Sequence, residues 1–274
     1  MERNELIELK AKWYNFTPIL FEIVKSLKNR ELSFIGKKDE TGIRMVRYLL
    51  AFNIDFLKKH FDRIIFDKSL ANMYQSVAQL KDVPVFSYNL RQRTKEENYI
   101  KFNKEYQNYV IGYDMFLDFD GKENFKKCHK EAQEMKEIFD EYKIPYWLMN
   151  SSSNGFHFHI PAEYMPPQKI VETIDILNGV LHNIKAIYSF ECLDETVVDM
   201  KRICKVPYSF VNDGTVCLPL NDFQFKTFMK ESVKAMTVLR NITLKNRGLL
   251  LRTHGLTDEK LKENVNKFIN EFNE

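Results

Sequence analysis

The stretch Tyr113-Asp114-Met115-Phe116-Leu117-Asp118-Phe119-Asp120-Gly121 is an apolar run, long enough for one buried strand, that carries two carboxylates just before a turn glycine. Side chains two positions apart on a strand leave on the same face, so we expect Asp118 and Asp120 to point into one volume. Ionised carboxylates side by side repel each other and are costly to bury. A divalent cation offsets both costs, and oxygen-only ligands favour Mg²⁺ or Mn²⁺ over zinc. Taken alone, the pair is also what a strand end with two solvated carboxylates would show.

The composition is that of an ordinary globular protein, with 44% hydrophobic and 29% charged residues among 274. Because the net charge is only +3, a nucleic-acid surface must come from local clustering of the 41 Lys and Arg residues. The four cysteines stand singly, which predicts reduced thiols and no zinc site. We find no secretory signal and no apolar run long enough to cross a bilayer, and therefore expect a cytoplasmic protein without a membrane partner.

Apolar spacing divides the chain into three predicted parts. Residues 1–29 read as two helices, or one kinked at Pro18. Residues 30–220 alternate strand and helix patterns, which predicts an α/β (α+β) core with a mixed sheet flanked by helices. Residues 221–274 are helical in pattern, with helices expected over 223–239 and 256–272 that pack on the core.

The core pattern is detailed enough to place individual elements. A hairpin is expected over 30–48 and strands over 71–79, 144–149, 156–161 and 216–220, with helices over 123–142 and 168–188. The polar stretch 91–108 interleaves basic residues with aromatics, a mixture used to hold single-stranded nucleic acids. A solvated loop explains the same composition, and we favour the loop.

Two further motifs follow the acidic strand. Residues 151–155, Ser-Ser-Ser-Asn-Gly, form a turn that leads into an alternating strand with His157 and His159. Asp194 is followed by Asp199 and then by basic residues, including Arg202 and Lys205, before Pro207. Three carboxylates (Asp118, Asp120 and Asp194) provide oxygens for a pair of metal ions about 3.5–4 Å apart, as nucleotidyl transfer requires. Donors for a triphosphate come from the turn, a histidine and the cations: Ser151, Ser153, Asn154, Gly155, His157, Arg202 and Lys205.

Each of these residues also has a purely structural interpretation. A histidine on an alternating strand is commonly a satisfied structural residue, and His159 could serve only to orient its neighbour. Asp194 could cap a helix that begins at Thr196. Asp199 is compatible with a metal ligand, an acceptor behind the ligands or an exposed helix residue. Arg202 and Lys205 could belong to a solvated helix end.

In combination, the three motifs resemble those of the archaeo-eukaryotic primase superfamily. Phe116–Asp120 is similar to the first motif of the primase catalytic subunit, and Ser151–His157 to the second. The third begins at Leu193 and continues through Ser209 toward Gly214 and the strand that ends at Leu220. The resemblance covers about residues 30–220. It implies that Glu31 and Arg44 lie near the initiating nucleotide. Members commonly carry a basic pair where this chain has Ser153-Asn154. This chain therefore lacks two donors that the resemblance would imply for binding a triphosphate.

The resemblance implies a metal-dependent primase-polymerase that uses two Mg²⁺ or Mn²⁺ ions and nucleoside triphosphates on a single-stranded DNA template. Replicative members usually carry a zinc-binding insertion near the first motif, and its absence here favours a compact stand-alone enzyme. Such enzymes are encoded by mobile elements, repair operons or CRISPR-linked loci, so an accessory replication, repair or CRISPR-linked protein is an allowed partner. A primase-like subunit that only binds single strands and a metal-dependent nuclease remain the alternatives.

Overall fold

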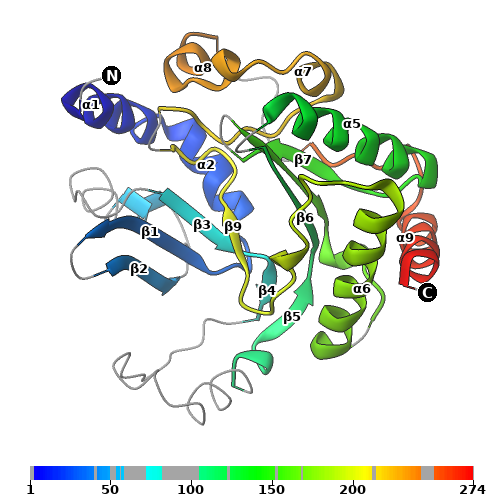
Figure 1. Cartoon of the computed structure of the whole chain (residues 1–274). Helices are drawn as coiled ribbons and strands as arrows, with labels where there is room; N and C mark the ends of the chain where they lie inside the picture. The colour runs from blue at the N-terminus through cyan, green and yellow to red at the C-terminus, as the bar shows by residue number, and fades with distance from the viewer. Residues whose placement is uncertain are drawn as a thin grey trace.

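The computed structural model describes residues 3–39, 42–49, 54–55, 57–58, 72–81, 105–121, 124–151, 154–167, 169–211, 214–241 and 250–273 (Figure 1). The strands are β1 (Leu32–Asp39), β2 (Gly42–Leu49), β3 (Asn72–Ser76), β4 (Ala78–Leu80), β5 (Val110–Tyr113), β6 (Met115–Asp120), β7 (Trp147–Asn150), β8 (Gly155–Ile160) and β9 (Ile203–Lys205). The α-helices are α1 (Arg3–Tyr14), α2 (Thr17–Ser26), α5 (Phe125–Tyr142), α6 (Ile170–Tyr188), α7 (Asp222–Lys226), α8 (Ala235–Asn241) and α9 (Asp258–Asn273). Short 3-10 helices are η2 (Ala162–Tyr164), η3 (Glu195–Val197) and η4 (Lys230–Val233).

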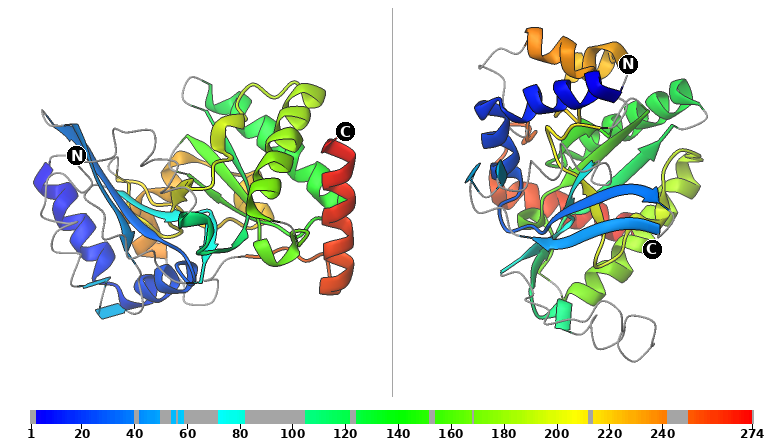
Figure 2. Two further views of the ribbon diagram at one scale, coloured as in Figure 1. Left: turned by 90° about the horizontal axis from the view of Figure 1, so that it is seen from below. Right: turned by 90° about the vertical axis from the view of Figure 1, so that its left-hand side faces the viewer.

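The first sheet has the strand order β2-β1-β3-β9, with antiparallel neighbours. Helices α1 and α2 lie beside it, and Figure 2 shows them on the opposite side of the molecule from α9. Pro18 stands in the first turn of α2, where its missing N–H costs no helical hydrogen bond. The buried side chains of Trp13, Ile23, Leu32 and Met73 form part of the core between these helices and the sheet.

The second sheet has the order β6-β8-β7, again antiparallel. Extended segments lengthen it at both edges, through bridges from Phe119 to Leu193 and from Met149 to Pro219. In its register Asp118 stands opposite His157, and Asp120 stands opposite Gly155. The pairing therefore places the first two sequence motifs next to each other.

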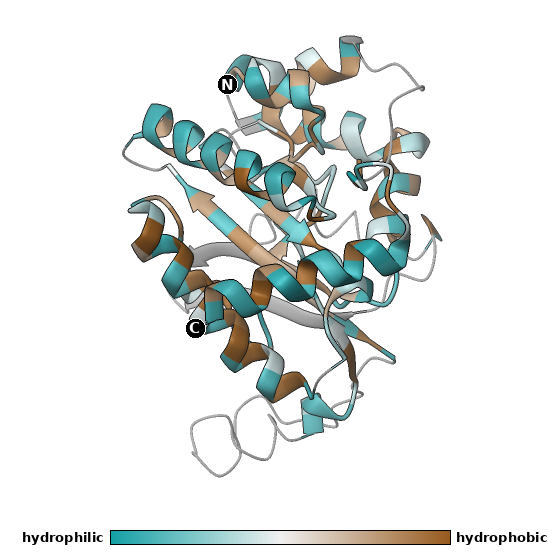
Figure 3. Ribbon diagram, turned by 90° about the vertical axis from the view of Figure 1, so that its right-hand side faces the viewer, coloured by the Kyte–Doolittle hydropathy of each residue, from teal (hydrophilic) through white to brown (hydrophobic). Residues whose placement is uncertain are grey.

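The two faces of this second sheet differ because side chains alternate along its strands. Leu117, Phe119 and Phe158 are fully buried and belong to the larger core. Phe158 packs against Phe139 of α5, which in turn contacts Phe268 of α9. Figure 3 looks onto this helical layer and shows hydrophilic and hydrophobic bands along its helices. No helix in the described residues is long and apolar enough to span a membrane.

A buried ion pair connects the two sheets. Arg30, just before β1, donates to the Ser76 and Val77 carbonyls and to the Asp114 carboxylate at 2.6 Å. Asp114, just before β6, also accepts the Ala162 amide at 3.0 Å. The position of β6 is thereby fixed relative to the first sheet.

His159 extends this network along the second sheet. Its Nδ1 lies 3.4 Å from Asp114 Oδ2, and its ring stacks on Trp147 with centroids 3.9 Å apart and planes at 6°. Burial lowers the pKa of His159 to about 4, against the opposing effect of the Asp114 carboxylate. The neutral ring is thus part of the packed interior at pH 7.

The α/β architecture is confirmed, and the strands are distributed over three sheets, the third being the antiparallel pair β4-β5. Three local predictions are wrong. The strand expected over 71–79 is two strands, β3 and β4, which belong to different sheets. The helix expected over 223–239 is α7, η4 and α8, and the strand expected over 216–220 contributes only isolated bridges at Val216 and Pro219. Residues 91–104 of the basic and aromatic stretch lie outside the described residues.

We predict that His159 makes the protein less stable as the pH falls from about 6.5 to about 4. The unfolded imidazole, with a pKa of about 6.5, binds a proton in this window, whereas the folded one stays neutral. Its contribution is fully present above the window and declines by up to about 1.4 kcal/mol per pH unit within it. Urea unfolding at several pH values gives the free energy of unfolding of wild type and of His159→Gln. Plotted against pH, the two free energies should converge toward pH 4.5. A constant difference between the two free energies across this pH range would contradict the lowered pKa of His159.

Candidate active site

A cavity of about 310 Å³ lies between the two larger sheets. The polar face of β6 and β8 forms one wall, and β3 and β9 form the other. Its lining residues are Tyr74, Phe116, Asp118, Asp120, Ser151, Asn154, Gly155, His157, Arg202, Ile203, Cys204 and Lys205. Most residues expected from the sequence to bind metal or nucleotide therefore share one cavity.

The acidic pair of β6 faces this cavity. The Asp118 side chain is 22% exposed, and its Oδ1 lies 3.4 Å from His157 Nε2. Burial alone would raise the pKa of Asp118, but His157, Arg202 and Lys205 together hold it below its ordinary value. Asp118 is therefore ionised at neutral pH, as an oxygen ligand or an electrostatic partner must be.

Ser151, Asn154 and Gly155, from the predicted turn, line the cavity. The Ser151 amide donates to the Gly155 carbonyl at 2.8 Å, and the Gly121 amide donates to the Asn154 carbonyl at 2.9 Å. A Cβ atom on Gly155 would lie 2.5 Å from the Phe119 carbonyl oxygen and 2.7 Å from Ser151 Oγ. Lys205 Nζ donates to the Ser151 carbonyl from the β9 side. The tight approach of the turn to β6 thus requires glycine at this position.

Asp194 lies beside the acidic strand, but its carboxylate is engaged elsewhere. Its amide donates to the Asp118 carbonyl at 2.9 Å. The side chain caps η3 by accepting the Thr196 amide at 2.9 Å and hydroxyl at 2.7 Å, and it lies 3.6 Å from Arg202. The capping role that its sequence context allowed is present, and Asp194 is not part of the cavity lining.

The donor set fits a divalent metal in part. Asp118 and Asp120 present oxygens to the same cavity, which suits Mg²⁺ or Mn²⁺. Within the described ranges, no three His, Cys, Asp or Glu side chains converge well enough to hold a metal ion. The third carboxylate, Asp194, is the one that does not converge in this arrangement.

Several expected site residues lie away from the cavity. Glu31 is fully buried and accepts from Ser33 Oγ at 2.5 Å. Asp199 is exposed and accepts the Lys201 amide. His159 belongs to the Asp114 network. Arg44 is on β2, which β1 and β3 separate from β9, and nothing is described of its side chain; Ser153 lies outside the described residues.

The sequence analysis missed three residues near the site. Asp114 shares the face of Asp118 at a spacing of four, so the period of two could have revealed it. Tyr74 lines the cavity from β3, and Lys230 reaches the turn from η4, donating to Asn154 Oδ1 at 2.6 Å. No local pattern marks either one, because their contacts span long sequence separations.

Comparisons with known proteins bear on the fold. No family model matches the chain. The chain is similar in fold to the polymerase domain from Mycobacterium tuberculosis Ligase D, solved in complex with DNA, with a TM-score of 0.53, 10% identity, and coverage of 86% of this chain and 90% of that one. An uncharacterized protein of Methanocaldococcus jannaschii is 38% identical over 75 residues, which is 26% of this chain and 17% of that protein. The structural likeness shows a shared fold, and the relative matches over only about a sixth of its own length.

We predict that Gly155→Ala destabilises the protein by about 1–3 kcal/mol, because the new methyl group meets a backbone oxygen that cannot move without disturbing β6. Gly179→Ala on α6 is the matched control. There the methyl group meets only the side-chain oxygen of Asn273, and alanine favours the helix. Urea unfolding should separate the two variants, and equal stabilities would contradict the close approach of the turn to β6.

Proposed function

We propose that this protein is a template-directed nucleotidyltransferase that makes or extends primers on single-stranded DNA from nucleoside triphosphates. The observation that carries the proposal is the cavity itself, which brings the carboxylates of β6 together with Arg202, with Lys205 of β9, and with Ser151, Asn154 and Gly155. The shared fold with a polymerase domain supports it. Because that domain was solved in complex with DNA, DNA is the first template to test.

The proposed chemistry includes divalent metal. Asp118 and Asp120 would hold the Mg²⁺ or Mn²⁺ ions, with Asp194 on the adjoining segment. Such ions, when bound, activate a 3′-hydroxyl and neutralise the charge that develops on the triphosphate. The lowered pKa of Asp118 keeps this ligand ionised without metal, so no proton has to leave it on binding.

The protein's own cations would bind the triphosphate. Lys205 and Arg202 line the wall opposite Asp118, and both act on that carboxylate electrostatically. His157 lies next to Asp118 and can donate to a phosphate oxygen. With the acidic and basic walls facing each other, one cavity could hold both the metal and the phosphates that it bridges.

We predict that Asp118→Asn and Asp120→Asn abolish primer synthesis and extension while single-stranded DNA binding survives. Each substitution removes a charge that the metal requires and keeps the side-chain volume. The assay uses unprimed and primed single-stranded templates with labelled NTPs or dNTPs and Mg²⁺ or Mn²⁺. Asp175→Asn, on α6 in the helical layer, is the matched control and should keep full activity.

The outcomes separate the alternatives. Metal-dependent product that needs triphosphates and is lost in both variants supports the proposal. DNA binding that weakens with salt, without any product, would indicate a binding subunit instead. Strand cleavage that needs no triphosphate would indicate a nuclease, and unchanged synthesis in Asp118→Asn would overturn the metal assignment.

We predict that Lys205→Ala raises the KM for the incoming nucleotide by about 10- to 100-fold with a smaller effect on kcat, because a charge-assisted contact with the phosphates is lost. Lys260→Ala, an exposed residue of α9, is the matched control. Steady-state extension kinetics at varied nucleotide concentration measures both constants. A KM unchanged in Lys205→Ala would remove Lys205 from the nucleotide site.

A further inference from the structure

The turn over 151–155 receives two ammonium groups from different parts of the chain. Lys205 of β9 donates to the Ser151 carbonyl, at the start of the turn. Lys230 of η4 donates to Asn154 Oδ1 at 2.6 Å, near its end. The sequence separation of 76 residues between Lys230 and Asn154 means that tertiary folding, not local structure, brings this second cation to the turn.

Lys230 is held in place by its surroundings. Its ammonium lies 4.9 Å from the centroid of the Phe125 ring, within the range of a cation–π contact. Phe125 packs against Phe228 and Phe156, at centroid distances of 5.8 and 5.9 Å. Phe156 belongs to β8, directly after the turn. The position of Lys230 relative to the turn is therefore set by buried aromatic packing, which reduces the entropy that a bound ligand would otherwise have to remove.

Neither ammonium group forms a direct ion pair at the turn, although Lys205 also acts electrostatically on the Asp118 carboxylate. The turn consists of serine, asparagine and glycine, so it carries no charge. Other cations nearby have acidic partners: Arg202 lies 3.6 Å from Asp194, and Lys234 lies 3.9 Å from Glu231. In the part of the chain that the structure describes, no ion pair involves Lys205 or Lys230. The turn thus carries a local excess of positive charge at one end of the cavity, which favours an anion.

The contact with Lys230 also orients the Asn154 amide. An ammonium group only donates, so the Asn154 side-chain oxygen must face Lys230. The amide nitrogen, on the other branch of the same planar group, is then turned away from Lys230. Asn154 lines the cavity, whereas Lys230 does not. Lys230 can therefore act on the cavity through Asn154 or through its charge.

We propose that Lys230 is a positioning residue for the terminal phosphates of a nucleoside triphosphate, which it serves by orienting the Asn154 amide and by adding positive potential at the turn. This inference rests on the proposed function, because it assigns the phosphate end of the same site. It also gives the C-terminal segment around η4 an indirect role in substrate binding, through Asn154. The ligand contacts that it predicts are to the β- and γ-phosphates and not to the base or sugar.

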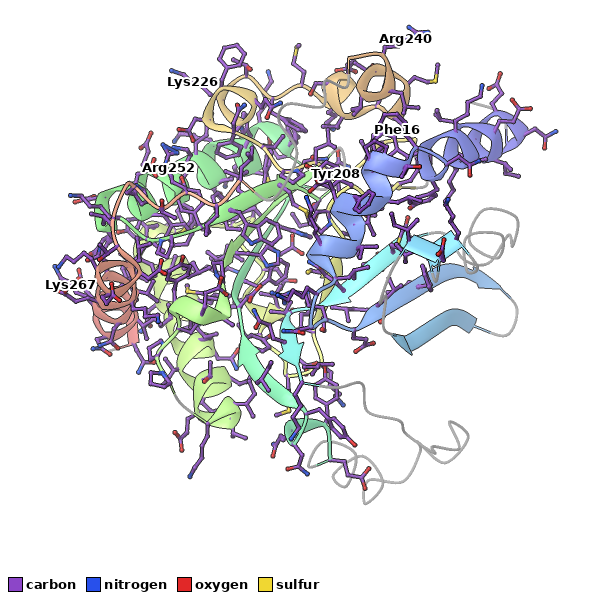
Figure 4. The ribbon with its side chains drawn as sticks, turned by 180° about the vertical axis from the view of Figure 1, so that it is seen from behind. Phe16, Tyr208, Lys226, Arg240, Arg252 and Lys267 are labelled. Carbon is purple, nitrogen blue, oxygen red and sulfur yellow. The ribbon has the colours of Figure 1, made fainter. Side chains whose placement is uncertain are left out.

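The test is equilibrium binding of ATP and AMP by calorimetry in the presence of Mg²⁺. Lys230→Ala should weaken ATP binding by about 5- to 30-fold, the loss of one charge-assisted interaction, and leave AMP binding within twofold. Lys230→Arg should restore most of the ATP affinity because the guanidinium also donates to Asn154. Lys226→Ala is the matched control: Lys226 is an exposed residue on α7 in the same segment, and Figure 4 places it at the periphery of the molecule.

A second comparison asks whether Lys230 acts through Asn154. In an Asn154→Ala background, removal of Lys230 should weaken ATP binding by clearly less than it does in wild type. An equal effect in both backgrounds would overturn the orienting role. In extension kinetics, Lys230→Ala should raise KM with kcat nearly unchanged, a division that a general loss of stability would not produce.

The binding of ATP and AMP by wild type and Lys230→Ala distinguishes a failure of this inference from a failure of the proposed function. If wild type prefers ATP over AMP and Lys230→Ala keeps that full preference, the inference is wrong and the proposed function stands. If wild type shows no preference for ATP, both are wrong. A loss of ATP and AMP binding together in Lys230→Ala would also overturn the inference, because the base and sugar contacts should not depend on Lys230.

Discussion

The buried ion pair between Arg30 and Asp114 is the constraint on which the rest of the site depends. Each partner would be an uncompensated interior charge without the other, and breaking such a pair typically costs about 3–5 kcal/mol. Arg30 is also bonded to the carbonyls of Ser76 and Val77, so the first sheet is fixed to the residue that precedes β6. Because Asp114 directly precedes β6 and Asp118 lies four residues further on, this contact helps to position the two cavity walls relative to each other.

The site lies between two sheets, and this position explains why its acidic and basic residues come from different parts of the fold. The second sheet has an apolar face that the helices α5, α6 and α9 cover, so only the opposite face is left for polar chemistry. That face supplies carboxylates and a histidine, while Lys205 comes from β9 of the first sheet and Arg202 directly precedes that strand. Neither sheet holds a complete set of groups. A substrate that bridges the walls therefore contacts residues whose spacing the whole fold determines.

The sequence predicted those features of the site that depend on the spacing of neighbouring residues. The period of two predicted that Asp118 and Asp120 share one face, and both line the cavity. The sheet register places His157 opposite Asp118. The predicted helix over 223–239 is interrupted because Val233 and Ala235 form backbone hydrogen bonds with the segment 214–216, which a helix could not satisfy. The sequence also could not reveal Arg30 as the partner of Asp114, because the contact spans 84 residues. Such pairings depend on the assembled fold.

The stacking of Trp147 on His159 has a practical consequence for observing this protein. The chain contains two tryptophans, and they lie in different cores: Trp13 packs with the first sheet, and Trp147 belongs to a small cluster on the polar side of the second. Replacing one with phenylalanine leaves the other as a single intrinsic fluorophore. The emission of Trp13 would then report the loss of packing around the N-terminal helices, and that of Trp147 the loss of packing behind the cavity. Comparing the two signals during unfolding would show whether both halves of the molecule come apart in one step.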